Sequence, residues 1–85
     1  METFYQDRIE ADPRICGNKP RIKNTRITVE AVLGSFLDGD TIEDLVRIYQ
    51  VEKEDIFACV EFAMKLVDIH WRKNLADPRD LEDED

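Results

Sequence analysis

The chain has little of what a disulfide-bonded or metal-held scaffold requires. Its 85 residues contain two cysteines and one histidine. Neither Cys16 nor Cys59 has a second cysteine or a histidine at the spacing of a metal site. These absences exclude a disulfide framework and a zinc-finger motif. We therefore predict a fold that depends on its own apolar core, with no metal and no other cofactor.

Long apolar runs and a secretion signal are missing as well. No uninterrupted apolar stretch approaches the ~20 residues that a membrane-spanning helix needs. The N-terminal segment METFYQDRIEADPR has neither the basic start nor the apolar run of a signal peptide. Two unpaired thiols are typical of a reducing compartment. We expect a soluble, cytoplasmic protein.

Residues for nucleophilic or metal-assisted catalysis are also sparse. His70, the single histidine, lies eleven residues from Cys59. On one helix this separation is about 16 Å, which is too far for a thiolate–imidazole pair. The carboxylates gather in residues 52–55 and 80–85, and no pattern brings them together from separate elements. We predict that the protein is not an enzyme.

Charge is divided unevenly along the chain, whose formal net charge is -8. Residues 1–27 hold six basic and four acidic groups, whereas residues 28–71 hold three basic and ten acidic groups. The remaining residues hold three basic and six acidic groups. A chain of this length forms one thin domain that buries only roughly 60–65% of its unfolded surface. A basic head on an acidic body suggests an interaction module.

Residues 1–27 are predicted to form a short strand-and-loop arm, because proline, glycine and asparagine interrupt its brief apolar stretches. Residues 22–27 are expected to close as a tight hairpin turn. Asn24 tolerates the left-handed backbone conformation that such turns often require.

After Thr28 the apolar period changes from two residues to 3.6, which predicts helices. Thr28 is a plausible N-cap of the first helix and Gly39 its stop. Thr41 and Asp44 resemble a capping box at the start of the second. The three predicted helices span about 28–38, 41–50, and from after Val51 to the region of Lys73.

Two apolar stripes are expected to supply the core. That of the first helix comprises Val29, Val32, Leu33, Phe36 and Leu37. The seam of the third helix comprises Ile56, Val60, Ala63, Val67 and Trp71, with Phe57 and Met64 beside it. The fold class is therefore mainly α: a three-helix, helix-turn-helix (homeodomain-like) domain over residues 28–73, preceded by the arm and followed by an acidic flexible tail, 74–85. Any small three-helix bundle matches the same pattern.

The phrase ICGNKP at residues 15–20, followed by RIKNTRI at 21–27, resembles the bacterial and archaeal family called domain of unknown function 433. Asn18 and Asn24 stand where that family commonly has glycine, which preserves access to left-handed backbone geometry. The resemblance covers roughly residues 8–67. It implies a helix-turn-helix-like fold and, for many members, the antitoxin half of a toxin–antitoxin pair whose partner is a small PIN-like ribonuclease. It carries over no catalytic site.

Nucleic-acid binding would depend on the basic segment 14–26, which contains no Asp or Glu. Its cations could follow a phosphate backbone or enter a minor groove. The alternative, ion pairs with the protein's own acidic helices or with an acidic partner, is at least as well supported. The third helix is poorly suited to read DNA, because its expected non-core positions carry three acids and one base, which repel phosphates. These positions are Glu54, Ala58, Glu61, Lys65 and Asp68. The candidate nucleic-acid contacts are Arg14, Lys19, Arg21, Lys23 and Arg26.

Protein binding would use the amphipathic end of the third helix, where Trp71 follows Val67. Trp71 could equally close the molecule's own core, and the same surface could form a homodimer. The candidate partner-binding residues are Met64, Val67 and Trp71. We expect a non-catalytic, antitoxin-like protein that sequesters a PIN-like ribonuclease toxin and contributes to repression of its own operon. The alternatives are a stand-alone DNA-binding regulator and a homodimeric interaction domain.

Overall fold

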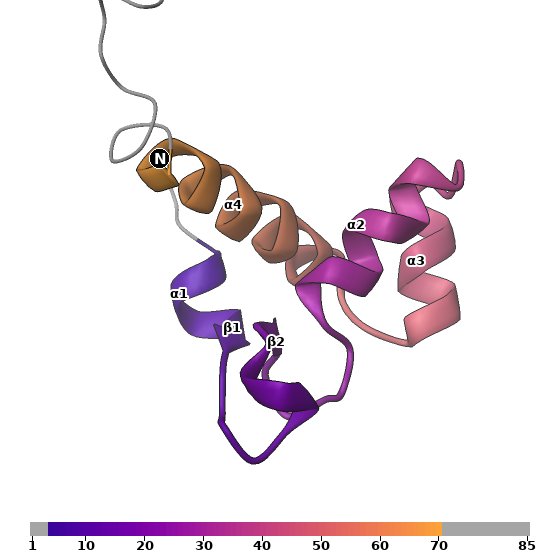
Figure 1. The fold of residues 1–85 in the computed structure, drawn as a ribbon. Helices are drawn as coiled ribbons and strands as arrows, with labels where there is room; N and C mark the ends of the chain where they lie inside the picture. The colour runs from indigo at the N-terminus through magenta and orange to yellow at the C-terminus, as the bar shows by residue number, and fades with distance from the viewer. Residues whose placement is uncertain (1–3, 71–85) are drawn as a thin grey trace, which may run out of the picture.

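A computed structural model of the protein describes residues 4–70, and the fold is mainly helical, as predicted (Figure 1). The expected tail, Trp71 and the end of the third helix lie outside the described residues. The described elements in chain order are α1 (Tyr5–Arg8), β1 (Ile9–Glu10), the 3-10 turn η1 (Cys16–Asn18), β2 (Arg21–Ile22), α2 (Val29–Leu37), α3 (Ile42–Tyr49) and α4 (Lys53–His70).

The predicted helix boundaries are confirmed to within two residues at each end that the structure describes. The Thr28 hydroxyl accepts a hydrogen bond from the Ala31 N–H and begins α2. Gly39 follows the end of α2 and has φ +98°. This backbone conformation strains any residue with a Cβ, so glycine suits the position. A full capping box of Thr41 and Asp44 begins α3.

The core lies where α4 meets α2 and α3. Figure 1 shows α4 as the long central helix, with α2 and α3 on one side and the arm on the other. Ile56 and Cys59 of α4 are fully buried against Val32 and Leu45. The buried cluster comprises Ile22, Val29, Val32, Leu45, Ile56 and Cys59.

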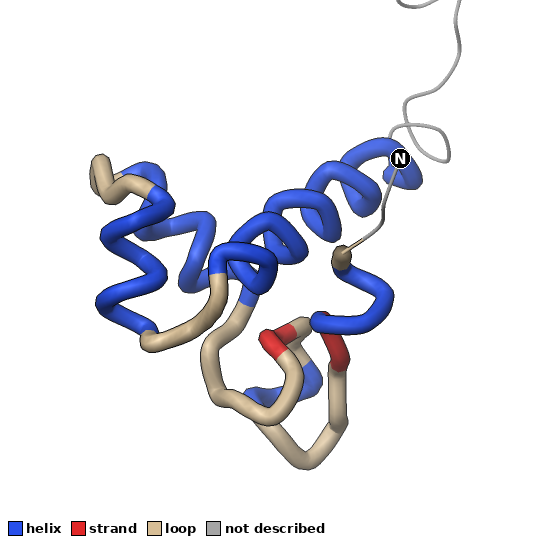
Figure 2. The backbone as a smooth tube through the Cα atoms, turned by 180° about the vertical axis from the view of Figure 1, so that it is seen from behind, coloured by secondary structure: helices blue, strands red, loops and turns tan. Residues whose placement is uncertain are grey.

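The arm is built on two very short strands that lie side by side (Figure 2). β1 and β2 are antiparallel, with Ile9 opposite Ile22 and Glu10 opposite Arg21. The chain then turns back tightly: the N–H of Ile22 donates to the carbonyl of Ile27 at 2.9 Å. Asn24 has φ +65° in this turn, which confirms the predicted hairpin turn and its left-handed residue.

A left-handed turn precedes β2. Its three residues, Cys16, Gly17 and Asn18, have φ values of 54°, 63° and 65°. Left-handed geometry is costly for residues with a Cβ, although asparagine tolerates it better than most. Asn18 therefore adopts the left-handed backbone conformation that glycine would adopt without strain.

The apolar pattern did not predict α1, nor the burial of the side of α4 that faces the arm. Ala58, predicted to be a non-core position, is fully buried. It lies three and four residues before Glu61 and Phe62, on the same face of α4. The arm contacts that face, because the rings of Tyr5 and Phe62 pack edge to face at 5.9 Å between centroids, and α1 also contacts α4.

Some residues of the two predicted apolar stripes are exposed and do not belong to the core. Leu37, at the last turn of α2, is 91% exposed. Val67, expected in the seam of the third helix, is 67% exposed. The elements that the structure describes therefore leave both side chains largely uncovered.

Candidate functional site

Three of the five candidate nucleic-acid contacts form ion pairs within the protein. Arg14 pairs with Asp12 at 3.0 Å, Lys19 with Glu30 at 2.8 Å and Arg21 with Glu10 at 2.7 Å. The hydrogen bond from Arg14 lowers the pKa of the Asp12 carboxyl. That from Lys19 lowers the pKa of Glu30, and the Lys19 pKa is raised in return. The basic segment is therefore largely neutralised by the protein's own acids.

Arg21 has a structural place in the arm. Its side chain is 5% exposed, and one guanidinium nitrogen donates to the carbonyl of Thr25 at 2.6 Å while another pairs with Glu10. Its Nε is buried without a hydrogen-bond partner. Arg21 thus joins β1 to the turn after β2 and presents almost no surface to a nucleic acid.

Lys23 and Arg26 are the two exposed cations of the turn, and neither forms an ion pair with a residue that the structure describes. Their backbones are held in place: the Lys23 N–H donates to the carbonyl of Arg8, and the Cys16 thiol donates to that of Arg26 at 3.7 Å. Two neighbouring cations provide a small part of a phosphate-binding surface.

The acidic groups on the first turns of α4 contact the arm. Arg8 bridges Glu52 at 2.8 Å and Asp55 at 2.9 Å, and these hydrogen bonds raise the pKa of its guanidinium. One turn further along, the Glu61 carboxylate accepts hydrogen bonds from the N–H groups of Phe4 and Tyr5. These carboxylates hold α1 on α4, across the face that a DNA-reading helix would have to present.

One of the two thiols, Cys59, lies inside the core. Cys59 is fully buried, and burial raises the pKa of its thiol to about 12, so the thiol stays protonated at neutral pH. Within residues 4–70, no group of three or more His, Cys, Asp or Glu side chains is placed to hold a metal ion.

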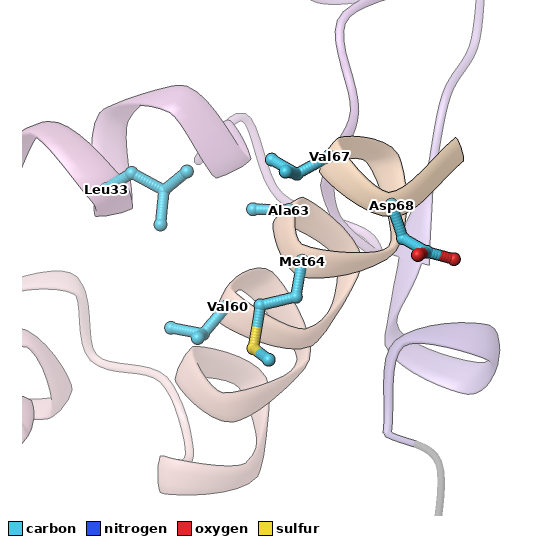
Figure 3. A pocket seen from close by; sticks show the side chains of 6 residues that line it. All are labelled: Leu33, Val60, Ala63, Met64, Val67 and Asp68. Carbon is cyan, nitrogen blue, oxygen red and sulfur yellow. The ribbon is translucent and has the colours of Figure 1, made fainter. Parts of the chain in front are cut away.

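An open apolar groove lies between α2 and α4. Two adjoining hollows share Leu33, Ala63 and Val67, and the larger has a volume of about 580 Å³. Figure 3 shows Leu33 facing Ala63 and Val67 across the open space, with Met64 and Val60 further down the same wall. We call this feature the α2–α4 groove and define it by Leu33, Gly34, Leu37, Val60, Ala63, Met64 and Val67.

Exposed side chains make the groove unusual for so small a domain. Leu37 is 91% exposed, and Met64 and Val67 are each 67% exposed. Contiguous exposed apolar surface of this kind marks interaction sites in soluble proteins. Met64 and Val67, named from the sequence as candidate partner-binding residues, both line the groove. The third, Trp71, lies outside the described residues.

The opposite wall of the groove was not predicted as a binding surface. Leu33 and Leu37 were assigned to the core because of their helical spacing. Their exposure depends on how far α2 and α4 diverge, which the spacing of apolar residues does not encode. Gly34, a helix-interior glycine on the same wall, was the available signal, because glycine in a helix costs stability and often marks a close approach of another backbone.

Fold and groove together define a class: a small, mainly helical domain with an open apolar groove beside its longest helix. More particularly, the family described as Protein of unknown function (DUF433) matches residues 9–63, more than half of the chain. The protein belongs to this family, which confirms the resemblance seen at residues 15–27. Comparison with curated proteins found no match. Comparison with solved structures found none either.

No helix among the described residues is long and apolar enough to cross a membrane.

Proposed function

We propose that the protein is a non-catalytic, cytoplasmic protein-binding module: the antitoxin half of a toxin–antitoxin pair that sequesters a PIN-like ribonuclease. The observation that carries protein binding is the α2–α4 groove, in which Leu37, Met64 and Val67 stand exposed. The identity of the partner rests on the resemblance of the ICGNKP and RIKNTRI phrases to family members with that role.

The charge distribution supports this proposal. Residues 28–71 hold ten acidic groups and three basic ones. A nuclease that binds RNA needs a basic groove, so an acidic protein is attracted to the same surface and competes with the substrate. Apolar contacts in the α2–α4 groove would supply affinity, and the acidic surface would supply steering and selectivity.

DNA binding by this chain alone is the second candidate. It is favoured by one observation: Lys23 and Arg26 are exposed beside the turn, and within residues 4–70 neither forms an ion pair. Their contribution is small without further cations. A part in repression of its own operon is therefore assigned to the complex of antitoxin and toxin, in which the partner adds further phosphate contacts.

The test begins with a pull-down of the tagged full-length chain from lysate of its native host, followed by mass spectrometry of proteins recovered in near-equal amount. The recovered protein is then purified alone and assayed for cleavage of a fluorescent RNA, with and without this chain. We expect a small PIN-like nuclease whose cleavage stops at about one equivalent of added protein.

Recovery of the bait alone, or of a partner without nuclease activity, would contradict the antitoxin proposal. A gel shift by the isolated chain separates the DNA alternative. If DNA binding is intrinsic, a shift at low salt should weaken on changing Lys23 and Arg26 to Glu, and the same changes should leave nuclease inhibition intact.

A further inference from the structure

We infer that the α2–α4 groove receives one amphipathic helix with basic flanks from the partner protein. This inference deepens the proposed function and rests on it for the identity of the partner as a protein. Among the described residues, this groove exposes the large apolar side chains of Leu37, Met64 and Val67, whereas the turn at residues 22–27 exposes cations.

The shape of the groove matches a helix. On the α4 wall, Val60, Ala63, Met64 and Val67 recur at i, i+3, i+4 and i+7, the spacing of one helical face. At a rise of 1.5 Å per residue they span about 10 Å, or two helical turns. A helix that docks here would present its own apolar residues at the same spacing, as in helix-in-groove recognition.

Small residues allow close approach of the incoming backbone. Gly34 and Ala63 line the groove on opposite walls. A Cβ placed on Gly34 would meet no other atom within 4 Å. The space beside Gly34 is therefore open in the free protein, although a glycine inside a helix costs about 1 kcal/mol relative to alanine. Close approach of a partner helix at Gly34 would explain why glycine is present there despite its effect on stability.

Charge decides between a foreign helix and a second copy of this chain. Every charged side chain among the described residues that line the groove is acidic, namely Glu30 and Asp68. Glu30 is exposed and pairs with Lys19 at the surface, and an exposed pair of this kind exchanges readily for a cation of a partner. A second copy, with its net charge of -8, would bring acids against acids. A helix with Lys or Arg beside its apolar face brings the complementary charge.

The experiment uses the full chain and a synthetic peptide of about 18 residues, long enough to form a helix in isolation. The peptide carries Leu at helical spacing i, i+3, i+4 and i+7 and Lys on both flanks of that face. A second peptide has Glu in place of each Lys, and a third has the composition of the first in scrambled order. Binding is measured by fluorescence anisotropy at low and at physiological salt.

Two variants block the groove by different means. Met64→Glu places a carboxylate on the apolar wall, and Gly34→Leu fills the open space while its Cβ meets no neighbour. Both are expected to weaken binding of the Lys peptide by about tenfold or more. Met64→Glu forces an unpaired charge into the apolar contact, and Gly34→Leu occupies the space that the peptide would fill. The control is Ile48→Glu, which makes the same kind of change at an exposed apolar residue of α3 outside the groove. It should leave affinity within about twofold.

The expected result is binding of the Lys peptide alone, loss on blocking the groove, and no loss in the control. Equal binding of the scrambled peptide, absence of binding by the Lys peptide, or equal loss in Ile48→Glu would overturn the inference. So would a dimer of the free chain in analytical ultracentrifugation that Met64→Glu dissociates, because a second copy would then occupy the groove. Melting temperatures of the three variants show that each remains folded.

The two proposals fail separately. If a PIN-like nuclease is inhibited as strongly by Met64→Glu and Gly34→Leu as by the unchanged chain, the function stands and the groove inference falls. If the Lys peptide binds in the groove and no nuclease partner exists, the groove inference stands and the antitoxin proposal falls.

Discussion

The two halves of α4 hold five and six apolar residues, yet their surroundings differ. In the first half, Ile56, Ala58 and Cys59 are fully buried, because α2 and α3 pack on one side and the arm on the other. In the second half, Met64 and Val67 stand two-thirds exposed. The first half contributes to the buried core, whereas the second half leaves the same type of side chain exposed. Apolar spacing along one helix therefore does not reveal which part is buried and which part is exposed.

The sharpest way to break this comparison is to truncate one apolar residue in each half. Ile56→Ala should lower the free energy of unfolding by about 2–5 kcal/mol, because it leaves a cavity in the only buried cluster of the described chain. Val67→Ala should change it by no more than about 0.5 kcal/mol. Urea unfolding followed by circular dichroism measures both. An equal loss in the two variants would mean that the second half of α4 is buried in the free protein.

A second prediction concerns how firmly the arm itself is held together. Arg21→Gln should lower stability by about 2–3 kcal/mol, because it removes a charged hydrogen-bond donor from Glu10 and from the Thr25 carbonyl inside the arm. Arg14→Gln is the control, since its pair with Asp12 is exposed and should contribute nothing measurable. Urea midpoints that coincide for the two variants would show that burial of Arg21 has no energetic importance.

The third prediction tests the contact of α1 with the middle of α4. Glu61→Ala removes the acceptor for the N–H groups of Phe4 and Tyr5 and should cost about 1 kcal/mol, as loss of a helix N-cap does. Hydrogen exchange of those two amides should accelerate in parallel. Lys65→Ala is the matched control, because Lys65 lies one turn further along the same face, is exposed, and donates no hydrogen bond to the backbone of Phe4 or Tyr5. Unchanged exchange in Glu61→Ala would argue against the capping role.

The smallest effect is expected at the groove wall. Gly34→Ala should raise stability by about 0.5–1 kcal/mol, because the added methyl enters open space and alanine favours the helix. Gly39→Ala should do the opposite, since its φ of +98° strains any residue with a Cβ. Thermal unfolding distinguishes the two signs. Destabilisation by Gly34→Ala would show that the wall of the groove is already packed.

Local signals in the sequence were sufficient for the helices and for the turn. The caps at Thr28 and Thr41 and the left-handed Asn24 each depend on a few neighbouring residues, and each lies where it was predicted. The family was also recognisable from two short phrases. The helix-turn-helix assignment stays a prediction, because the structure confirms only the mainly helical fold class.

Features that depend on distant residues could not be predicted. The four residues of α1 are too few to form a helix alone, and their contacts with Glu61 cross more than fifty positions. Ala58 was misassigned for the same reason, because its burial depends on contacts between α4 and residues distant in the sequence. Composition also could not tell which cation of the basic segment is buried, and the answer is Arg21.

The candidate site was predictable in part. Met64 and Val67 were named from their place on an amphipathic helix, and the structure puts both in the α2–α4 groove. Leu33 and Leu37 were assigned to the core, because their spacing fits a buried stripe equally well. Only the divergence of α2 from α4 decides that these side chains face an opening.

The hydrogen bonds from the backbone of Phe4 and Tyr5 to Glu61 have a consequence for how the protein is made. The arm is synthesised first, yet it finds its binding surface only after the ribosome has released most of α4. Until then, Ile22 of β2 lacks its final neighbours in α4, and the nascent chain exposes apolar surface. Docking of the arm on α4 is therefore expected to follow the synthesis of α4, although the arm is made before that helix.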